Sequence, residues 1–183
     1  MIAIRRIALP EHAINLRPSP VTSNRMPIEK LQAIDADILE RLQRNARVSN
    51  ASLANVVGLS PSACLRRVRS LEQRGYVRNY VTMLNPERLG LGASVFVQVS
   101  LEKKDESTLQ RFEREIYKCP EVMECYLMTG DSDYLLRVVV PDVPAFERFL
   151  INHLTKVRGI NSIRSSFSLK QVKYTTALPL DAV

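Results

Sequence analysis

The sequence has few of the residues on which metal sites and disulfide frameworks depend. Among its 183 residues there are three cysteines and two histidines. An odd number of cysteines with no Cys-x-x-Cys pair predicts neither disulfides nor a zinc site, and it favours the reducing cytoplasm. No run of 18 or more apolar residues occurs, so no membrane-spanning segment is expected. We therefore expect a cytoplasmic chain that binds neither a metal nor a membrane.

A catalytic set is also missing. His12 lies near the N-terminus, and His153 lies on one face of a predicted helix, where we expect it to border a packing contact. Asp131 and Asp133 could form an acid–base pair, but no nucleophile or third partner accompanies them. The chain is therefore not expected to be an enzyme or to need a cofactor. Its strand patterns also lack the aromatic motif of RNA-binding sheets.

What the sequence has is positive charge, and all of the excess lies in the first half. The net charge of the chain is +7. Residues 1–92 hold 14 of the 26 Lys and Arg residues but only 7 of the 19 Asp and Glu residues, whereas residues 93–183 are neutral. Attraction to phosphates supplies most of the sequence-independent affinity of a DNA-binding protein. The charge therefore indicates DNA as a partner of the first half and a different role for the second.

The first 27 residues form a segment of their own. Residues 1–27 contain four prolines among scattered apolar residues, and no apolar stretch long enough for a secretory signal follows Arg5 and Arg6. We interpret this segment as a disordered N-terminal extension. Two alternatives are a true start at Met26 and a basic arm that contacts DNA.

Residues 28–77 carry the pattern of a helix-turn-helix. Helical spacing gives a first apolar stripe made of Leu31, Ile34, Ile38, Leu39 and Leu42. A second, short helix is expected between Ser49, which suits an N-cap, and Gly58, which can adopt the positive φ of a tight turn. Ser60 and Pro61 then predict the start of a third helix, because proline is favoured at the first helical position.

The third helix is the candidate DNA-binding element. Four of its residues are expected to share an inward face at 100° per residue: Cys64, Leu65, Val68 and Leu71. The candidate DNA-binding residues on the other side and its flanks are Ser60, Ser62, Ala63, Arg66, Arg67, Arg69, Ser70 and Gln73. Arginine can bind guanine in the major groove, and the N–H groups of a first turn can bind phosphate. The alternative is the solvated face of an ordinary three-helix bundle.

The second half predicts an α+β domain. Residues 78–92 are expected to be a linker that includes a strand. The patterns that follow over residues 93–183 predict strands at 93–101, 122–129, 134–140 and 160–174 and helices at 106–118 and 144–157. This βαββαβ order is ferredoxin-like. Because the two helices would cover only one face of the sheet, two copies are expected to pair through the other face.

The turn Gly130-Asp131-Ser132-Asp133 has two interpretations, and the residues alone favour neither. A tight hairpin prefers glycine and aspartate. The same residues could also bind an amino acid, since a carboxylate can hold an ammonium group and exposed N–H groups can hold a carboxylate.

Five segments carry a family resemblance. They are residues 34–39, 58–68, 84–86, 130–136 and 172–176. On these segments the chain resembles the Lrp/AsnC family of bacterial and archaeal regulators, also called feast/famine regulators, from about Leu31 to Leu180. Residues 120–126 and 164–167 look like the leucine-responsive branch, particularly regulators of branched-chain amino-acid catabolism.

The resemblance implies a winged-type helix-turn-helix joined to a ferredoxin-like domain for effector binding and oligomerisation. It implies a DNA-binding transcriptional regulator of amino-acid metabolism that forms homodimers, assembles to octamers and binds palindromic operators. The effector would be a small amino acid such as leucine or another branched-chain amino acid. By position, its site would comprise Gly130, Asp131, Asp133, Ser166, Phe167 and Ser168.

The chain departs from the family pattern at two positions. Ala63 stands where the family often has proline, and Ser132 stands where an aromatic residue is common. Two other functions stay open: a nucleoid-associated DNA-packing protein, which an arginine-rich helix permits, and an amino-acid-sensing subunit of an enzyme, which would not bind DNA.

Overall fold

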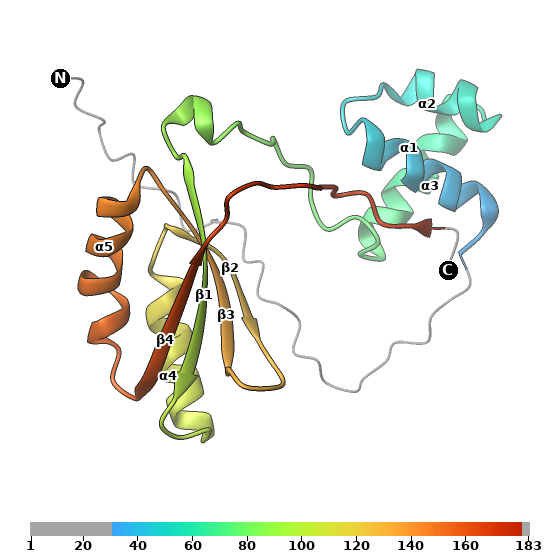
Figure 1. The fold of residues 1–183 in the computed structure, drawn as a ribbon. Helices are drawn as coiled ribbons and strands as arrows, with labels where there is room; N and C mark the ends of the chain where they lie inside the picture. The colour runs from blue at the N-terminus through green and yellow to red at the C-terminus, as the bar shows by residue number, and fades with distance from the viewer. Residues whose placement is uncertain (1–30, 181–183) are drawn as a thin grey trace. The chain divides into compact units, whose positions relative to one another are not determined.

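The computed structural model describes residues 31–180 and divides them into two compact units (Figure 1). Within that range, the first unit comprises residues 31–78 and 177–180, and the second comprises residues 79–176. The extension predicted for residues 1–27 lies outside the described residues. The C-terminal boundary differs from the predicted one, because residues 177–180 belong with the N-terminal helices and not with the sheet.

Three helices make up the body of the first unit. They are α1 (Ala33–Arg44), α2 (Asn50–Val57) and α3 (Pro61–Gln73). Apolar residues from all three helices form one buried core, which consists of Ile38, Leu39, Leu53, Ala54, Cys64 and Leu71. The helix-turn-helix expected from the apolar periodicity is therefore confirmed.

The helix ends follow from their capping residues. The Ser49 hydroxyl accepts a hydrogen bond from the N–H of Ser52 at 3.1 Å, and the Ser60 hydroxyl accepts one from the N–H of Ala63 at 3.3 Å. Each cap satisfies a backbone donor that has no partner inside its helix. Gly58 ends α2 with φ 68°, a conformation that glycine adopts without strain.

The C-terminal segment is held on α1. The side-chain amide of Gln43 donates to the carbonyl of Leu178 at 3.2 Å and accepts from its N–H at 2.6 Å. Leu180 is partly buried against the core of the three helices. One glutamine thus satisfies both backbone groups of Leu178, as a neighbouring strand would.

No strand forms in the linker between the units. Residues 79–92 are irregular except for one 3-10 turn, η1 (Glu87–Leu89). The predicted linker strand is therefore not observed within the described chain. A strand needs a neighbour to pair its N–H and C=O groups, and no strand of the sheet within residues 31–180 pairs with this segment.

The second unit has two layers, with helices packed on one face of an antiparallel sheet (Figure 1). Its elements are β1 (Ala93–Leu101), α4 (Glu106–Tyr117), β2 (Val122–Leu127), β3 (Tyr134–Val140), α5 (Val143–Asn152), η2 (Leu154–Lys156) and β4 (Ile160–Phe167). The strand order is β2-β3-β1-β4. This arrangement confirms the ferredoxin-like prediction. The helix predicted over 144–157 is interrupted at His153, where φ is −117° and ψ is −69°.

Buried and exposed residues alternate along the central strands, and the buried ones show where the core lies. Val95, Val97 and Val99 are fully buried, whereas Phe96 and Gln98 between them are exposed. The apolar side chains of β1 and β3 pack against helix residues that include Phe112, Ile116, Phe146, Phe149 and Leu154. Within residues 31–180, the helices bury one face of the sheet and leave the other uncovered.

The last strand is shorter than its sequence pattern suggests. The pattern predicts a strand over 160–174, but β4 ends at Phe167. Phe167 lies opposite Val95, and the N–H of Ser168 donates to the carbonyl of Ser94 at 2.9 Å. Because β1 begins at Ala93, β4 has no partner beyond this point.

The contact between Gln43 and Leu178 is testable by hydrogen exchange. Gln43→Ala removes both hydrogen bonds, so we expect faster exchange of the Leu178 amide and a loss of about 1 kcal/mol in the free energy of unfolding. Gln73→Ala makes the same change at an exposed helix position and should leave the Leu178 amide unaffected. Unchanged protection of Leu178 in Gln43→Ala would contradict this contact.

Candidate functional site

The exposed side of α3 carries two arginines among small polar groups. Four exposed side chains fall within about 60° of arc at 100° per residue, and we call them the arginine face: Ser62, Arg66, Arg69 and Gln73. Among the described residues, no carboxylate forms an ion pair with Arg66 or Arg69. Both guanidinium groups can therefore bind an external phosphate or base edge.

Arg67 has a different position. Its guanidinium donates to the carboxylate of Asp35 at 2.7 Å and to the side-chain oxygen of Gln32 at 3.0 Å. Asp35 is only 5% exposed, and a buried carboxylate requires a charged partner. The pair joins α3 to the first turn of α1. The structure thus assigns the guanidinium of Arg67, expected to contact DNA, to the packing of the first unit.

The remaining candidates on α3 differ in exposure. Ser60 is the N-cap, and Ala63 and Ser70 are half-buried at the edge of the arginine face. Leu65 was expected to point inward, but it is 38% exposed. The helix packs through Cys64 and Leu71, which are buried, and Leu65 lies about 100° from Cys64 around the axis.

The turn between β2 and β3 uses one of its aspartates for structure. Asp133 is 5% exposed, its Oδ2 accepts from the N–H of Leu101 at 2.8 Å, and its Oδ1 pairs with Lys104 Nζ at 2.8 Å. The Leu101 hydrogen bond, reinforced by Lys104, holds the pKa of the Asp133 carboxyl below its ordinary value. Asp131 is exposed, so it is the carboxylate of this turn that can reach a ligand.

The two parts of the predicted effector site lie at opposite ends of β1. The N–H of Asp133 donates to the carbonyl of Val99 at 2.9 Å, whereas Phe167 lies opposite Val95. At about 3.3 Å per residue, Val95 and Val99 are roughly 13 Å apart along the strand. One chain therefore does not bring Gly130 and Asp131 together with the segment Ser166–Ser168.

The sequence patterns do not predict the roles of two residues at these sites. Lys104 is the partner of Asp133, and Asp35 is the partner of Arg67. Each pair joins residues far apart in the sequence, so no helical or strand spacing indicates it. For Asp35 the sequence offers one signal, which is the place of an aspartate among the apolar residues of a predicted helix.

The site offers little for catalysis. Burial raises the pKa of the Cys64 and Cys119 thiols, which disfavours the nucleophilic thiolate. Across residues 31–180, no cluster of three His, Cys, Asp or Glu side chains could hold a metal ion. None of the helices in this range is long and apolar enough to cross a membrane.

Known proteins show the same division of the chain. Residues 31–78 match the family described as winged helix-turn-helix DNA-binding, and residues 94–178 match the Lrp/AsnC ligand binding domain. The Bkd operon transcriptional regulator of Pseudomonas aeruginosa is 48% identical over 151 residues, covering 82% of this chain and 99% of the relative. The leucine-responsive regulatory protein of Escherichia coli is 38% identical over 158 residues, covering 86% and 96%.

Solved structures of similar proteins share the fold. A transcriptional regulator from Neisseria meningitidis, in complex with L-methionine, has a TM-score of 0.79 and 41% identity, covering 83% of this chain and 98% of its own. An AsnC family regulator from Agrobacterium tumefaciens has a TM-score of 0.79 and 39% identity, covering 83% and 99%.

A helix-turn-helix with an exposed arginine face, joined to a ligand-binding ferredoxin-like unit, defines a DNA-binding transcriptional regulator that also binds a ligand. The predicted resemblance is confirmed by both matching regions and by the relatives. The chain belongs to the Lrp/AsnC family of transcriptional regulators.

The structural role of Asp133 predicts a pH dependence. Because its pKa is lowered in the folded protein, the stabilisation is present at neutral pH and is lost as the pH falls through the folded-state pKa. Asp133→Asn should lower the free energy of unfolding by about 1–3 kcal/mol at pH 7, and this difference should shrink as the pH is lowered from about 5 towards 2.

Urea denaturation across this pH range measures the effect, with Asp131→Asn as the matched control in the same turn. At pH 7, the variant at the exposed Asp131 should have nearly the same free energy of unfolding as the parent. A constant deficit for Asp133→Asn down to low pH would show that the carboxylate charge has no part in closing the turn.

Proposed function

We propose that the chain regulates genes of amino-acid metabolism by binding palindromic operators as a homodimer, with α3 in the major groove. The observation that carries this proposal is the arginine face on the third helix of the helix-turn-helix, where two guanidinium groups have no carboxylate partner in the described part of the chain. In a dimer, the two α3 helices would lie about 34–36 Å apart, one turn of DNA.

The uncovered face of the sheet supports dimer formation. Phe96 on β1 and Tyr126 on β2 are exposed, and a sheet with helices on one side only needs a second layer. A second copy supplies such a layer by twofold symmetry. Further assembly of dimers to octamers, which family membership favours, is part of the proposal, and it can also supply a pairing partner for the linker.

The proposed effector is a small amino acid such as leucine, another branched-chain amino acid or methionine. Its support is the leucine-responsive and Bkd operon relatives and the neighbour bound to L-methionine. Asp131 would hold the ammonium group, and the backbone beside Gly130 would approach the carboxylate. The segment Ser166–Ser168 of another copy would form the wall of the pocket, since one chain holds the two parts apart.

Arg66→Ala tests the reading of DNA. If Arg66 binds a base edge, the substitution should lower the affinity for the specific operator by about 1–3 kcal/mol. Gel-shift titrations across salt concentrations measure this loss, and Arg114→Ala, an exposed arginine on α4, is the control that should bind as the parent does.

A different outcome distinguishes a packing protein from a sequence-specific regulator. If Arg66→Ala weakens all DNA sequences equally and reduces the salt slope by about 1, the residue contacts only phosphate. If unrelated DNA then competes for the protein as strongly as the operator does, a nucleoid-packing protein is favoured. If the chain binds no DNA even at low salt, an amino-acid-sensing subunit of an enzyme is favoured.

Asp131→Asn tests the effector site. A thermal-shift screen of the twenty amino acids should identify ligands that raise the melting temperature, because they bind the folded state. For the best ligand, Asp131→Asn should weaken binding about tenfold or more, since a charge-assisted hydrogen bond is lost. Asp37→Asn, at an exposed position on α1, is the control. Equal affinity in both variants would remove Asp131 from the site.

A further inference from the structure

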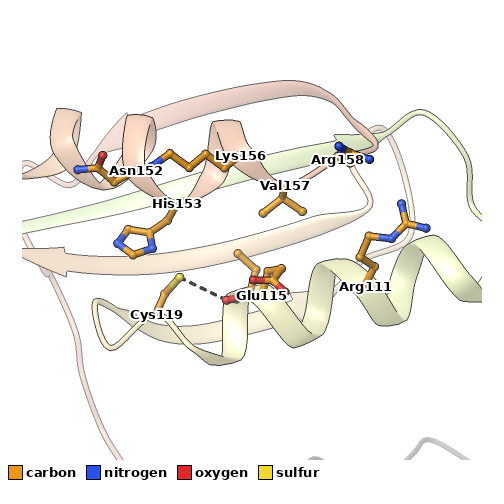
Figure 2. A pocket seen from close by; sticks show the side chains of 9 residues that line it. Arg111, Glu115, Cys119, Asn152, His153, Lys156, Val157 and Arg158 are labelled. Atoms are coloured by element: carbon orange, nitrogen blue, oxygen red, sulfur yellow. Dashed lines mark hydrogen bonds between the residues drawn. The ribbon is translucent and has the colours of Figure 1, made fainter.

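The second unit contains a cavity that neither proposed site uses. It has a volume of about 340 Å³ and lies between α4 and the segment that joins α5 to β4 (Figure 2). This volume is in the range of sites for small metabolites. None of the residues 130–133 or 166–168 lines it, so it is separate from the proposed effector site.

Positive charge converges on this cavity without a matching negative charge. Arg111, Lys156 and Arg158 line it, and no described carboxylate forms an ion pair with any of them. Figure 2 shows Arg111 and Arg158 at the same end of the cavity. Like charges in one concave site repel each other, and a bound anion removes that cost.

Helix capping does not explain these arginines. Arg111 lies about two turns before Lys118, the C-cap of α4, whereas dipole effects act within the last turn. Arg158 lies outside any helix. Lys156 is different, because it stands in the last turn of η2 and is suited to that helix end. The guanidinium groups of Arg111 and Arg158 are therefore the part of the cavity whose charge indicates a bound ligand.

The one carboxylate that lines the cavity is already occupied. Glu115 forms an ion pair with Lys118 at 2.7 Å on the same helix. The floor is apolar, with Ile116 and Val157 buried. A ligand in this space thus meets a cationic end and an apolar floor, with little net negative charge.

The other end of the cavity is polar, and the side chain of Lys156 extends toward it (Figure 2). Asn152, His153 and Cys119 lie there, away from the two arginines (Figure 2). The Cys119 thiol donates to the carbonyl of Glu115 at 3.4 Å, and burial raises its pKa, so it stays protonated. His153 stacks on Phe149 with ring centroids 5.5 Å apart. This end suits hydroxyl groups, which can form hydrogen bonds with the Asn152 amide and the Lys156 ammonium.

We propose that this cavity binds a small phosphate monoester, a second ligand distinct from the amino-acid effector. Its dianionic phosphate lies between Arg111 and Arg158, because guanidinium groups bind phosphate through paired hydrogen bonds. Its neutral body extends over Val157 towards Asn152 and His153. A monocarboxylate would leave more of the positive charge uncompensated, so the dianion is preferred.

Equilibrium dialysis of the full chain with radiolabelled glycerol 3-phosphate, at constant ionic strength, tests the proposal. The parent should bind, and Arg111→Ala combined with Arg158→Ala should weaken binding at least tenfold. Arg114→Ala, on the same helix but outside the cavity, should bind as the parent does. Glu115→Gln should tighten binding severalfold, because it removes the one negative charge that lines the site. Inorganic phosphate should compete, whereas acetate and glycerol should not.

Several results would overturn the site. They are no binding by the parent at 10 mM ligand, equal affinity in the double variant, or loss of binding in Arg66→Ala, which would move phosphate to the DNA-binding helix. If the double variant does not fold by circular dichroism, Arg158→Ala alone decides, since this residue lies outside every helix and strand. The outcome is independent of operator binding and of the amino-acid screen.

Discussion

The pairing of β1 with two neighbours determines the dimensions of the second unit. β3 and β4 each pair with β1 and not with each other, and β3 also pairs with β2. Among the described strands, β4 therefore has β1 as its one neighbour. The same strand buries Val95, Val97 and Val99 against the helices. It also holds the turn before β3 at one end and the end of β4 at the other. An effector site that uses both parts must therefore draw them from different copies of the chain.

Two buried carboxylates close the junctions on which the proposed sites stand. Asp35 holds α3 to α1 through Arg67, and Asp133 holds its turn to β1 and Lys104. Reasoning from sequence assigned Arg67 and Asp133 to binding, because charged residues near a motif suggest a ligand. In the structure each of these residues also has a structural role, because the buried carboxylates of Asp35 and Asp133 are held by their partners. Their neighbours Arg66 and Asp131 are exposed, which is why the proposed function assigns binding to them.

The sequence predicted best what depends on local spacing. Alternation predicted the bounds of β1 and β3, and the serine caps and Gly58 predicted where α2 and α3 begin or end. It failed where an element depends on a distant partner. Residues 168–174 have a strand pattern, but within the described chain neither they nor the linker pairs with a strand of the sheet. The contact of Leu178 with Gln43 joins residues 135 positions apart. Contacts between residues far apart along the chain produce no periodic pattern in the sequence.

Both covalent connections between the units leave the sheet at one end. The linker enters β1 at Ala93, and β4 ends at Phe167, with Ser168 hydrogen-bonded to Ser94. In the proposed function, a ligand on Ser166–Ser168 would therefore act on a segment that Gln43 binds again at Leu178. Loop-closure entropy changes by only about 0.6 kcal/mol per doubling of length, so freeing a few residues changes it by a few tenths of a kcal/mol. Allosteric coupling is typically about 1–3 kcal/mol. In the proposed function, most of the effector response would then come from contacts between copies, where the two parts of the proposed site would meet.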